Sequence, residues 1–119
     1  MAARMEWKSP RYLVPLYTGD AYYADPAVPA GVRGRAALLS YFTTLLGHNP
    51  NWVWTHHDSI PMKDGFLNKW HASIPVCSRT FEVEGVCTVQ LRAGRIYLNE
   101  VFFDRRELLR AIEVWRMVR

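Results

Sequence analysis

The chain has 119 residues, half of them hydrophobic and 13% aromatic, which indicates one globular domain rather than a disordered segment. Its 15 lysines and arginines against 11 acidic residues give a formal net charge of +4, but the basic residues are scattered, so we expect no nucleic-acid partner. No apolar stretch approaches the roughly 20 residues that cross a bilayer, and the first 12 residues lack the apolar core of a signal peptide, so we expect a cytoplasmic protein without a membrane partner.

Two helical patterns flank a short strand in the first half of the chain. Ser9 before Pro10 is a helix start signal, and the apolar residues that follow predict a short helix ending at Gly19. Residues 20–25, DAYYAD, read as a strand, and a loop rich in proline and glycine comes next. Apolar residues then repeat at i, i+4, i+7 and i+8, which predicts a second helix that Gly47 is expected to stop.

From residue 51 the hydrophobic period changes to two. Four strand-like segments follow one another, and the Asp64-Gly65 pair is a hairpin signal between the first two. Residues 92–94, RAG, read as another tight turn between the last two. The pattern therefore predicts an antiparallel meander.

An amphipathic helix is expected to close the chain. Asp104 is followed three residues later by Glu107, as in a capping box, and apolar residues then recur at helical spacing. The basic residues of this segment, Arg105 among them, are interpreted mainly as its solvated side. Helices with four antiparallel strands predict an α+β fold, in which a curved antiparallel sheet wraps around the helices as a cone with an internal cavity.

The sequence offers no motif for a metal or a cofactor. The two cysteines, Cys77 and Cys87, are too few for a disulfide scaffold and read as reduced packing residues. In WTHHDS, His56 and Asp58 share one strand face and His57 takes the other, which gives two ligands where zinc needs three or four. A glycine-rich phosphate loop is also absent, so we expect neither metal nor cofactor.

Four ordered motifs resemble the nuclear transport factor 2-like superfamily, and within it the SnoaL-like polyketide cyclases and steroid delta-isomerases. They are GDAYYADPAVPAGVRGRAALLSYF, Trp70 in FLNKWHAS, Gly85 in VEGVCTVQL, and the closing GRIYLNEVFFDRRELL, and they span most of residues 10–112. The resemblance implies a cone-shaped, cystatin-like α+β barrel with a deep apolar cavity, commonly a homodimer through the outer face of the sheet. On this interpretation, residues 1–119 form a single SnoaL-like domain whose first helix is short or missing.

The resemblance also implies roles for single residues. In the ketosteroid isomerase relatives, the aspartate of the matching Asp-Pro pair is the general base, and Asp25 falls on it. In the limonene-epoxide-hydrolase relatives a tyrosine and an asparagine two apart hold a water, and Tyr23 and Asp25 fall there. The isomerases' protonated aspartic acid falls at or next to Cys87, and the strand of Trp70 lacks the hydrolases' arginine-aspartate pair, while Val101 replaces a further aspartate. We therefore expect neither of these known designs.

Period-two alternation sorts the strand residues into two faces once Trp70 is taken to face the cavity, as the family suggests. The inner wall is then mostly apolar and aromatic, with few polar points, as in small-molecule sites. The residues expected to bind a ligand are Asn68, Trp70, Cys87, Tyr97, Asn99, Val101 and Phe103.

Asp25 is the candidate catalytic residue. In an apolar cavity its charged form is disfavoured, which suits a group that takes and returns a proton near neutral pH. The alternative is that Asp25 only caps the loop after its strand by accepting backbone hydrogen bonds. With Tyr23 and His56 as its partners, we expect an isomerase, cyclase or hydratase acting on an apolar carbonyl-containing or aromatic metabolite. The alternative function is a non-catalytic ligand-binding or dimerisation module of the same fold.

Overall fold

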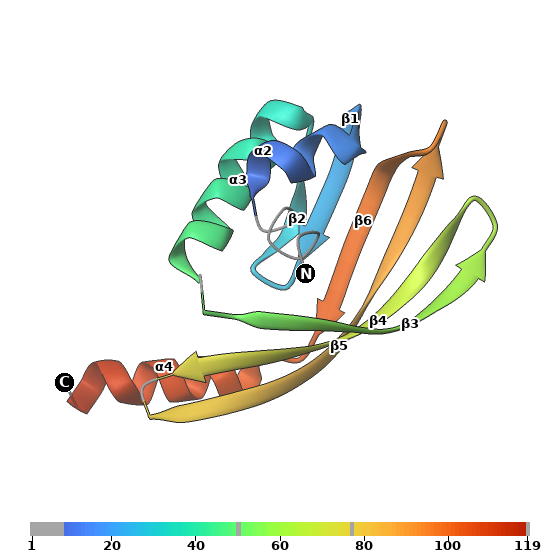
Figure 1. Ribbon diagram of the computed structural model, residues 1–119. Coiled ribbons are helices and arrows are strands. Elements are labelled where there is room, and N and C mark those ends of the chain that lie inside the picture. Colours follow the sequence, from blue (N-terminus) through green and yellow to red (C-terminus); the bar gives the residue numbers. More distant parts are fainter. Residues whose placement is uncertain (1–8, 50, 77, 119) are drawn as a thin grey trace.

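The computed structural model describes residues 9–49, 51–76 and 78–118, so Cys77 lies outside the described residues. A six-stranded sheet in the order β2-β1-β6-β5-β4-β3 forms its centre (Figure 1). Its strands are β1 (Tyr17–Asp25), β2 (Val28–Arg33), β3 (Val53–Met62), β4 (Gly65–Val76), β5 (Arg79–Arg92) and β6 (Arg95–Phe103). The helices are α2 (Pro10–Leu13), the 3-10 turn η1 (Val14–Leu16), α3 (Arg35–His48) and α4 (Arg106–Val118).

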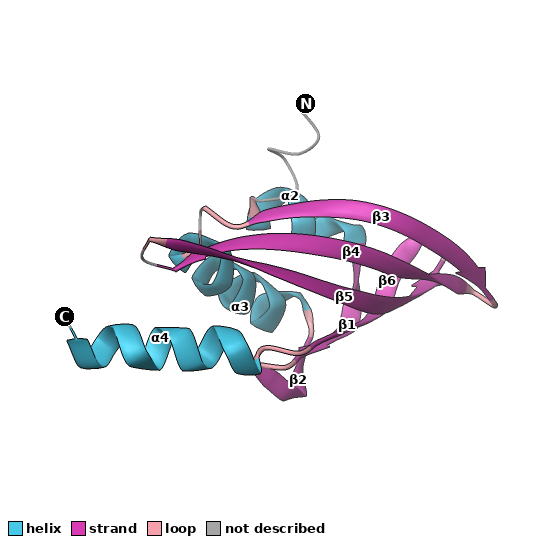
Figure 2. Cartoon of the chain, turned by 90° about the horizontal axis from the view of Figure 1, so that it is seen from below, coloured by secondary structure: helices cyan, strands magenta, loops and turns pink. Residues whose placement is uncertain are grey.

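The expected meander is formed by β3 to β6, whose neighbours pair antiparallel. Two-residue turns join β3 to β4 and β5 to β6, and in the β5–β6 turn Ala93 and Gly94 both have positive φ, at 51° and 80°. A turn with positive φ at both central residues, as between β5 and β6, matches the twist of the flanking strands and fixes their register. The strands β3, β4 and β5 are long and bend together, so the sheet curves (Figure 2).

Strand β2 is a correction to the sequence-based prediction, because residues 26–34 were expected to form a loop. Its residues VPAGVR contain a proline and a glycine, which are tolerated in a strand at the edge of a sheet. Strand β2 pairs antiparallel with β1, whereas β1 runs parallel to β6. The fold is α+β as predicted, but the sheet is mixed rather than antiparallel and does not close into a barrel.

Two helix ends also differ from the prediction. The first helical segment ends with η1 at Leu16, and β1 already begins at Tyr17, before Gly19. Helix α3 continues through Gly47 to His48, where the side chain of Asn49 donates a hydrogen bond to the carbonyl oxygen of Leu45 at 2.7 Å. This bond satisfies one of the free carbonyls at the helix end.

Helices α2 and α3 lie together beside β1 and β2, whereas α4 runs along the far ends of β4 and β5 (Figures 1 and 2). The buried apolar residues form two clusters accordingly. The first joins η1, β1 and α3, and the second joins β4, β5 and α4. Ile96 and Val101 of β6 pack against both clusters and thus stand between them.

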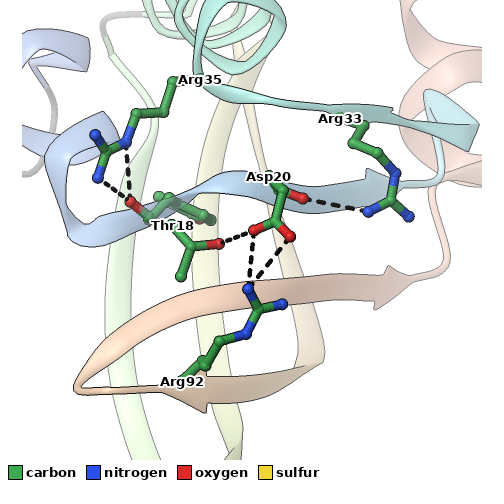
Figure 3. A network of polar contacts seen from close by, with 6 residues as sticks. Thr18, Asp20, Arg33, Arg35 and Arg92 are labelled. Atoms are coloured by element: carbon green, nitrogen blue, oxygen red, sulfur yellow. Dashed lines mark hydrogen bonds and ion pairs between the residues drawn. The ribbon is translucent and has the colours of Figure 1, made fainter.

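Polar contacts at one end of the sheet fix the position of β1 (Figure 3). The Arg92 guanidinium contacts both carboxylate oxygens of Asp20 at 3.2 Å, and Thr18 donates to the same carboxylate at 2.8 Å. Arg35, the first residue of α3, donates two hydrogen bonds to the carbonyl oxygen of Tyr17 at 2.7 and 3.1 Å. These contacts join β1 to the β5–β6 hairpin and to α3.

Candidate functional site

A pocket of about 620 Å³ lies between the two core clusters. All the strands except β2, together with α2, α3 and α4, contribute to its wall, and this wall is largely apolar. The volume is in the range of pockets that bind small molecules. Its aromatic members include Tyr17, Tyr23, Trp52, Trp54, Trp70 and Phe103.

Asp25, at the end of β1, lines this pocket and is 8% exposed. Its oxygen Oδ1 accepts hydrogen bonds from the backbone N–H groups of Ala27 at 2.8 Å and Val28 at 3.1 Å. Its oxygen Oδ2 accepts from the hydroxyl groups of Tyr23 at 2.8 Å and Tyr41 at 2.7 Å. The structure thus combines both arrangements considered for Asp25, because the carboxylate caps the loop and also lines the pocket. Four donors offset the desolvation of this buried group.

The tyrosines around Asp25 are held in their protonated form. Burial raises the pKa of Tyr23 well above its ordinary value, and the charge of Asp25 raises it further. The pKa of Tyr41 is also raised, first by desolvation and then by its hydrogen bond to Asp25. Both hydroxyls are therefore hydrogen-bond donors to the carboxylate over the physiological pH range.

Two asparagines place amide groups at the pocket wall. Asn99 Nδ2 donates to the hydroxyl oxygen of Tyr17 at 2.9 Å, and burial raises the pKa of that tyrosine to about 12. Burial likewise raises the pKa of the Cys87 thiol. A hydrogen bond with Asn68 lowers this pKa, but by less than burial raises it. The Oδ1 atoms of Asn68 and Asn99 are buried and have no hydrogen-bond partner among the described residues. A buried acceptor left unpaired costs about 1–3 kcal/mol, so the amide oxygens lower the stability of this wall.

Most residues assigned to the cavity wall from alternation do line the pocket. The list is Tyr23, Asn68, Trp70, Cys87, Asn99, Val101 and Phe103. The exception is Tyr97, whose hydroxyl donates to the Gln90 side chain and whose ring lies against the Arg92 guanidinium. The ladder between β5 and β6 shifts register between Gln90 and Leu91, and Ile96 takes the inner position in place of Tyr97. This irregularity reverses the alternation and corrects the prediction for Tyr97.

His56 on β3 also lines the pocket but remains exposed. It makes no hydrogen bond to Asp25, whose four donors are the two tyrosines and the two backbone groups named above. The next residue, His57, stacks on His71 at a ring separation of 5.7 Å. Within the described ranges of the chain, no three histidine, cysteine, aspartate or glutamate side chains gather in a way that could hold a metal ion.

Two polar residues of the site were missed by the sequence analysis. Tyr41 lies three residues after Leu38 on α3, so helical spacing alone places it near the buried face, but nothing in the sequence pairs it with Asp25. Arg105 was interpreted as solvated, whereas it is partly buried and lines the pocket. It directly precedes α4, where the chain turns back from β6, and helical periodicity gives no information on such a residue.

Comparison with known proteins gives consistent results. A family model described as a SnoaL-like domain matches residues 2–99. The crystal structure of TerC, co-crystallised with polyporic acid, is 14% identical with a TM-score of 0.78, covering 93% of this chain and 91% of TerC. A structure reported as a SnoaL-like polyketide cyclase from Jannaschia sp. CCS1 is 13% identical with a TM-score of 0.77, covering 93% and 88% of the two chains.

A further similar structure is a hypothetical protein with a ketosteroid isomerase-like fold from Catenulispora acidiphila DSM 44928, in complex with trimethylamine. It is 17% identical with a TM-score of 0.77, and the match covers 92% of this chain and 90% of that protein. Among curated protein sequences, no match is found. At these identities the structural likeness concerns the fold alone.

Proposed function

The chain belongs to the SnoaL-like family, and from this premise we propose that it binds an apolar aromatic or carbonyl-containing metabolite and transfers a proton to or from it through Asp25. Isomerisation, cyclisation and hydration are the reactions that such a transfer serves. One observation carries the proposal: among the described residues that line the pocket, Asp25 is the only acidic one. TerC, a protein of the same fold, was co-crystallised with polyporic acid, which supports a small-molecule ligand here.

The hydrogen bonds of Asp25 indicate which oxygen would react. The two backbone donors hold Oδ1 in place, whereas Oδ2 is bonded only to side-chain hydroxyls, which can rotate. A substrate proton would therefore arrive at Oδ2, with the hydroxyl of Tyr23 or Tyr41 moving aside. Tyr23 and Tyr41 are poor candidates for the base themselves, because their pKa values are raised.

Exchange of enolisable protons tests this role without knowledge of the natural substrate. In deuterium oxide, we expect the protein to accelerate exchange at the α-carbon of aromatic ketones such as 1-tetralone and 2-tetralone, followed by NMR. Asp25→Asn should lower the rate by about 100-fold or more, the contribution of a positioned general base. Asp58→Asn is the control, because Asp58 lies on β3, is exposed and does not line the pocket. Unchanged exchange in Asp25→Asn would contradict proton transfer by Asp25.

A second candidate function is ligand binding without catalysis. This candidate is favoured by the hydrogen bonds of Asp25, since each of its carboxylate oxygens already accepts from two donors. Tyr41→Phe separates the two functions, because it removes one donor from Oδ2 and leaves that oxygen free to accept a substrate proton. Faster exchange in Tyr41→Phe supports a general base, whereas binding of the ketones with no exchange in either protein supports a binding module.

The same fold assignment leads us to propose a homodimer through the outer face of the sheet. Val53 and Phe102 are exposed there, at 43% and 51%, because their neighbours along β3 and β6 point into the pocket. Light scattering should give twice the mass of the chain. Phe102→Glu should convert the dimer to a monomer, because it places a charge in the apolar part of the interface. A monomeric wild-type protein would contradict the dimer.

A further inference from the structure

The pocket contains one charged group that the proposed function does not use. Arg105 is partly buried and lines the pocket, and it forms no ion pair with any described residue. An arginine guanidinium carries five N–H donors and stays charged at every physiological pH. Removing such a group from water without a partner is unfavourable.

The acidic residues near Arg105 are already occupied by other donors. Asp25, the acid of the pocket wall, accepts its four hydrogen bonds from other groups. Asp104, which precedes Arg105 in the chain, is bound by the side chain and the backbone N–H of Arg106. Glu107 lies on the exposed side of α4 and does not line this pocket.

The charge of Arg105 nevertheless acts within the site. It lowers the pKa of Tyr41 slightly, against the larger effects of burial and of Asp25. The guanidinium therefore lies close enough to affect the group of tyrosines around Asp25. Two arginines of α4 differ from Arg105. Arg106 is ion-paired with Asp104, and Arg110 does not line the pocket.

We propose that Arg105 binds the carboxylate of the ligand, so that this pocket takes an aromatic acid whose apolar body lies among the aromatic side chains. Arginine and carboxylate match in geometry, since two parallel N–H donors meet two oxygens. A bound carboxylate would supply the partner that Arg105 lacks. The inference rests on the proposed binding function and adds the chemical class of the ligand to it.

A matched pair of probes tests the inference. 2-Naphthoic acid and 2-naphthamide have nearly the same size and shape, but only the acid is charged at pH 7. Their affinities can be measured by NMR from the indole N–H signals of Trp52, Trp54 and Trp70, all of which line the pocket. Because a hydrogen bond to a charged group contributes about 1.5–3 kcal/mol, we expect the acid to bind about 10- to 100-fold more tightly than the amide.

Two variants identify the group responsible. Arg105→Gln should abolish the preference for the acid, and continued binding of the amide shows that the variant is folded. Arg110→Gln removes a charge from α4 away from the pocket and should retain the preference.

The possible failures are distinguishable. Equal binding of acid and amide to the wild-type protein would overturn the role of Arg105 and leave the pocket as a binding site. A preference that persists in Arg105→Gln would overturn it as well, because another group would then hold the carboxylate. If neither probe binds, the proposed function fails and this inference fails with it.

Discussion

At the scale of single residues, the site depends on which polar groups are paired. Asp25 shares one oxygen between two tyrosines and the other between two backbone groups, and such charge-assisted hydrogen bonds are among the stronger ones in proteins. Tyr17 differs, because its hydroxyl accepts a hydrogen bond from the neutral amide of Asn99. The three tyrosines of this region therefore share raised pKa values for partly different reasons.

The raised pKa of Tyr17 predicts a loss of stability at alkaline pH. In the unfolded chain this tyrosine ionises near pH 10, whereas in the folded protein it ionises near pH 12. Below pH 10 both states are protonated and the full stability is present. Between pH 10 and 12 the unfolded state loses its proton first, so the free energy of unfolding falls as pH rises.

Urea denaturation between pH 8 and 11.5 measures this effect. Tyr17→Phe should flatten the decline, because the substituted chain has one fewer group that ionises only after unfolding. Tyr12→Phe is the control, since the side chain of Tyr12 is 60% exposed. If the free energy of unfolding declined equally in the wild type and in Tyr17→Phe, the raised pKa of Tyr17 would be contradicted.

The residues of the pocket wall could be predicted from the sequence only where successive side chains of a strand point regularly to opposite faces of the sheet. Trp70, Cys87 and Asn68 were placed correctly because β4 and β5 pair without interruption over that region. Tyr97 was misplaced because a register shift cannot be read from hydrophobicity. Arg105 was misjudged for a related reason, since charge is a poor guide to orientation where a chain turns between two elements.

At the scale of elements, the sheet depends on a close contact between two neighbouring strands. A Cβ atom at Gly85 of β5 would lie 2.2 Å from the Trp70 ring, on the paired strand β4. The indole therefore covers the backbone of Gly85, and this arrangement helps to keep Trp70 at the pocket wall.

Gly85→Ala should accordingly displace the Trp70 ring. We expect a loss of about 1–3 kcal/mol in the free energy of unfolding, which is the usual effect of overpacking, together with a shifted tryptophan fluorescence maximum. Gly19→Ala on β1 is the matched control, because a Cβ there meets nothing within 4 Å. An unchanged spectrum and an unchanged stability in Gly85→Ala would contradict the contact.

The hairpins and the closing helix could be predicted from the sequence. In the first half of the chain, strand β2 and the end of helix α3 could not. Asp64 and Gly94 are residue types that adopt positive φ readily and both do so in their turns, whereas Ala93 has positive φ without being such a residue type. Strand β2 was hidden because Pro29 and Gly31 are loop residues by composition, and only its pairing with β1 makes it a strand. Gly47 does not end α3, because helix ends depend on what caps them.

At the scale of the whole molecule, the pocket is lined by residues of both core clusters, and Ile96 and Val101 of β6 pack against both of them. A bound molecule would therefore contact both clusters at once. None of the helices in the described part of the chain is sufficiently long and apolar to cross a membrane.

The alkylation rate of Cys87 measures how accessible the pocket is to a small reagent. The raised pKa of this cysteine keeps the thiol protonated at pH 7, so alkylation by iodoacetamide should be slower than for a free thiol and should accelerate as pH rises. In a Cys77→Ser background, 2-naphthamide in excess should slow the reaction further, because Cys87 lines the pocket. Mass spectrometry measures the rate, and a rate unaffected by a bound probe would show that the probe lies elsewhere.

The open sheet has a consequence for how the protein behaves at high concentration. Its two outermost strands, β2 and β3, each have one side with no neighbouring strand in the described structure, and such sides can recruit other chains into fibrils. Each of them contains a proline, Pro29 in β2 and Pro61 in β3. A proline has no N–H to donate and interrupts any ladder that another strand would build there. The two prolines therefore oppose the pairing of these edge strands with strands of other molecules, and with it aggregation.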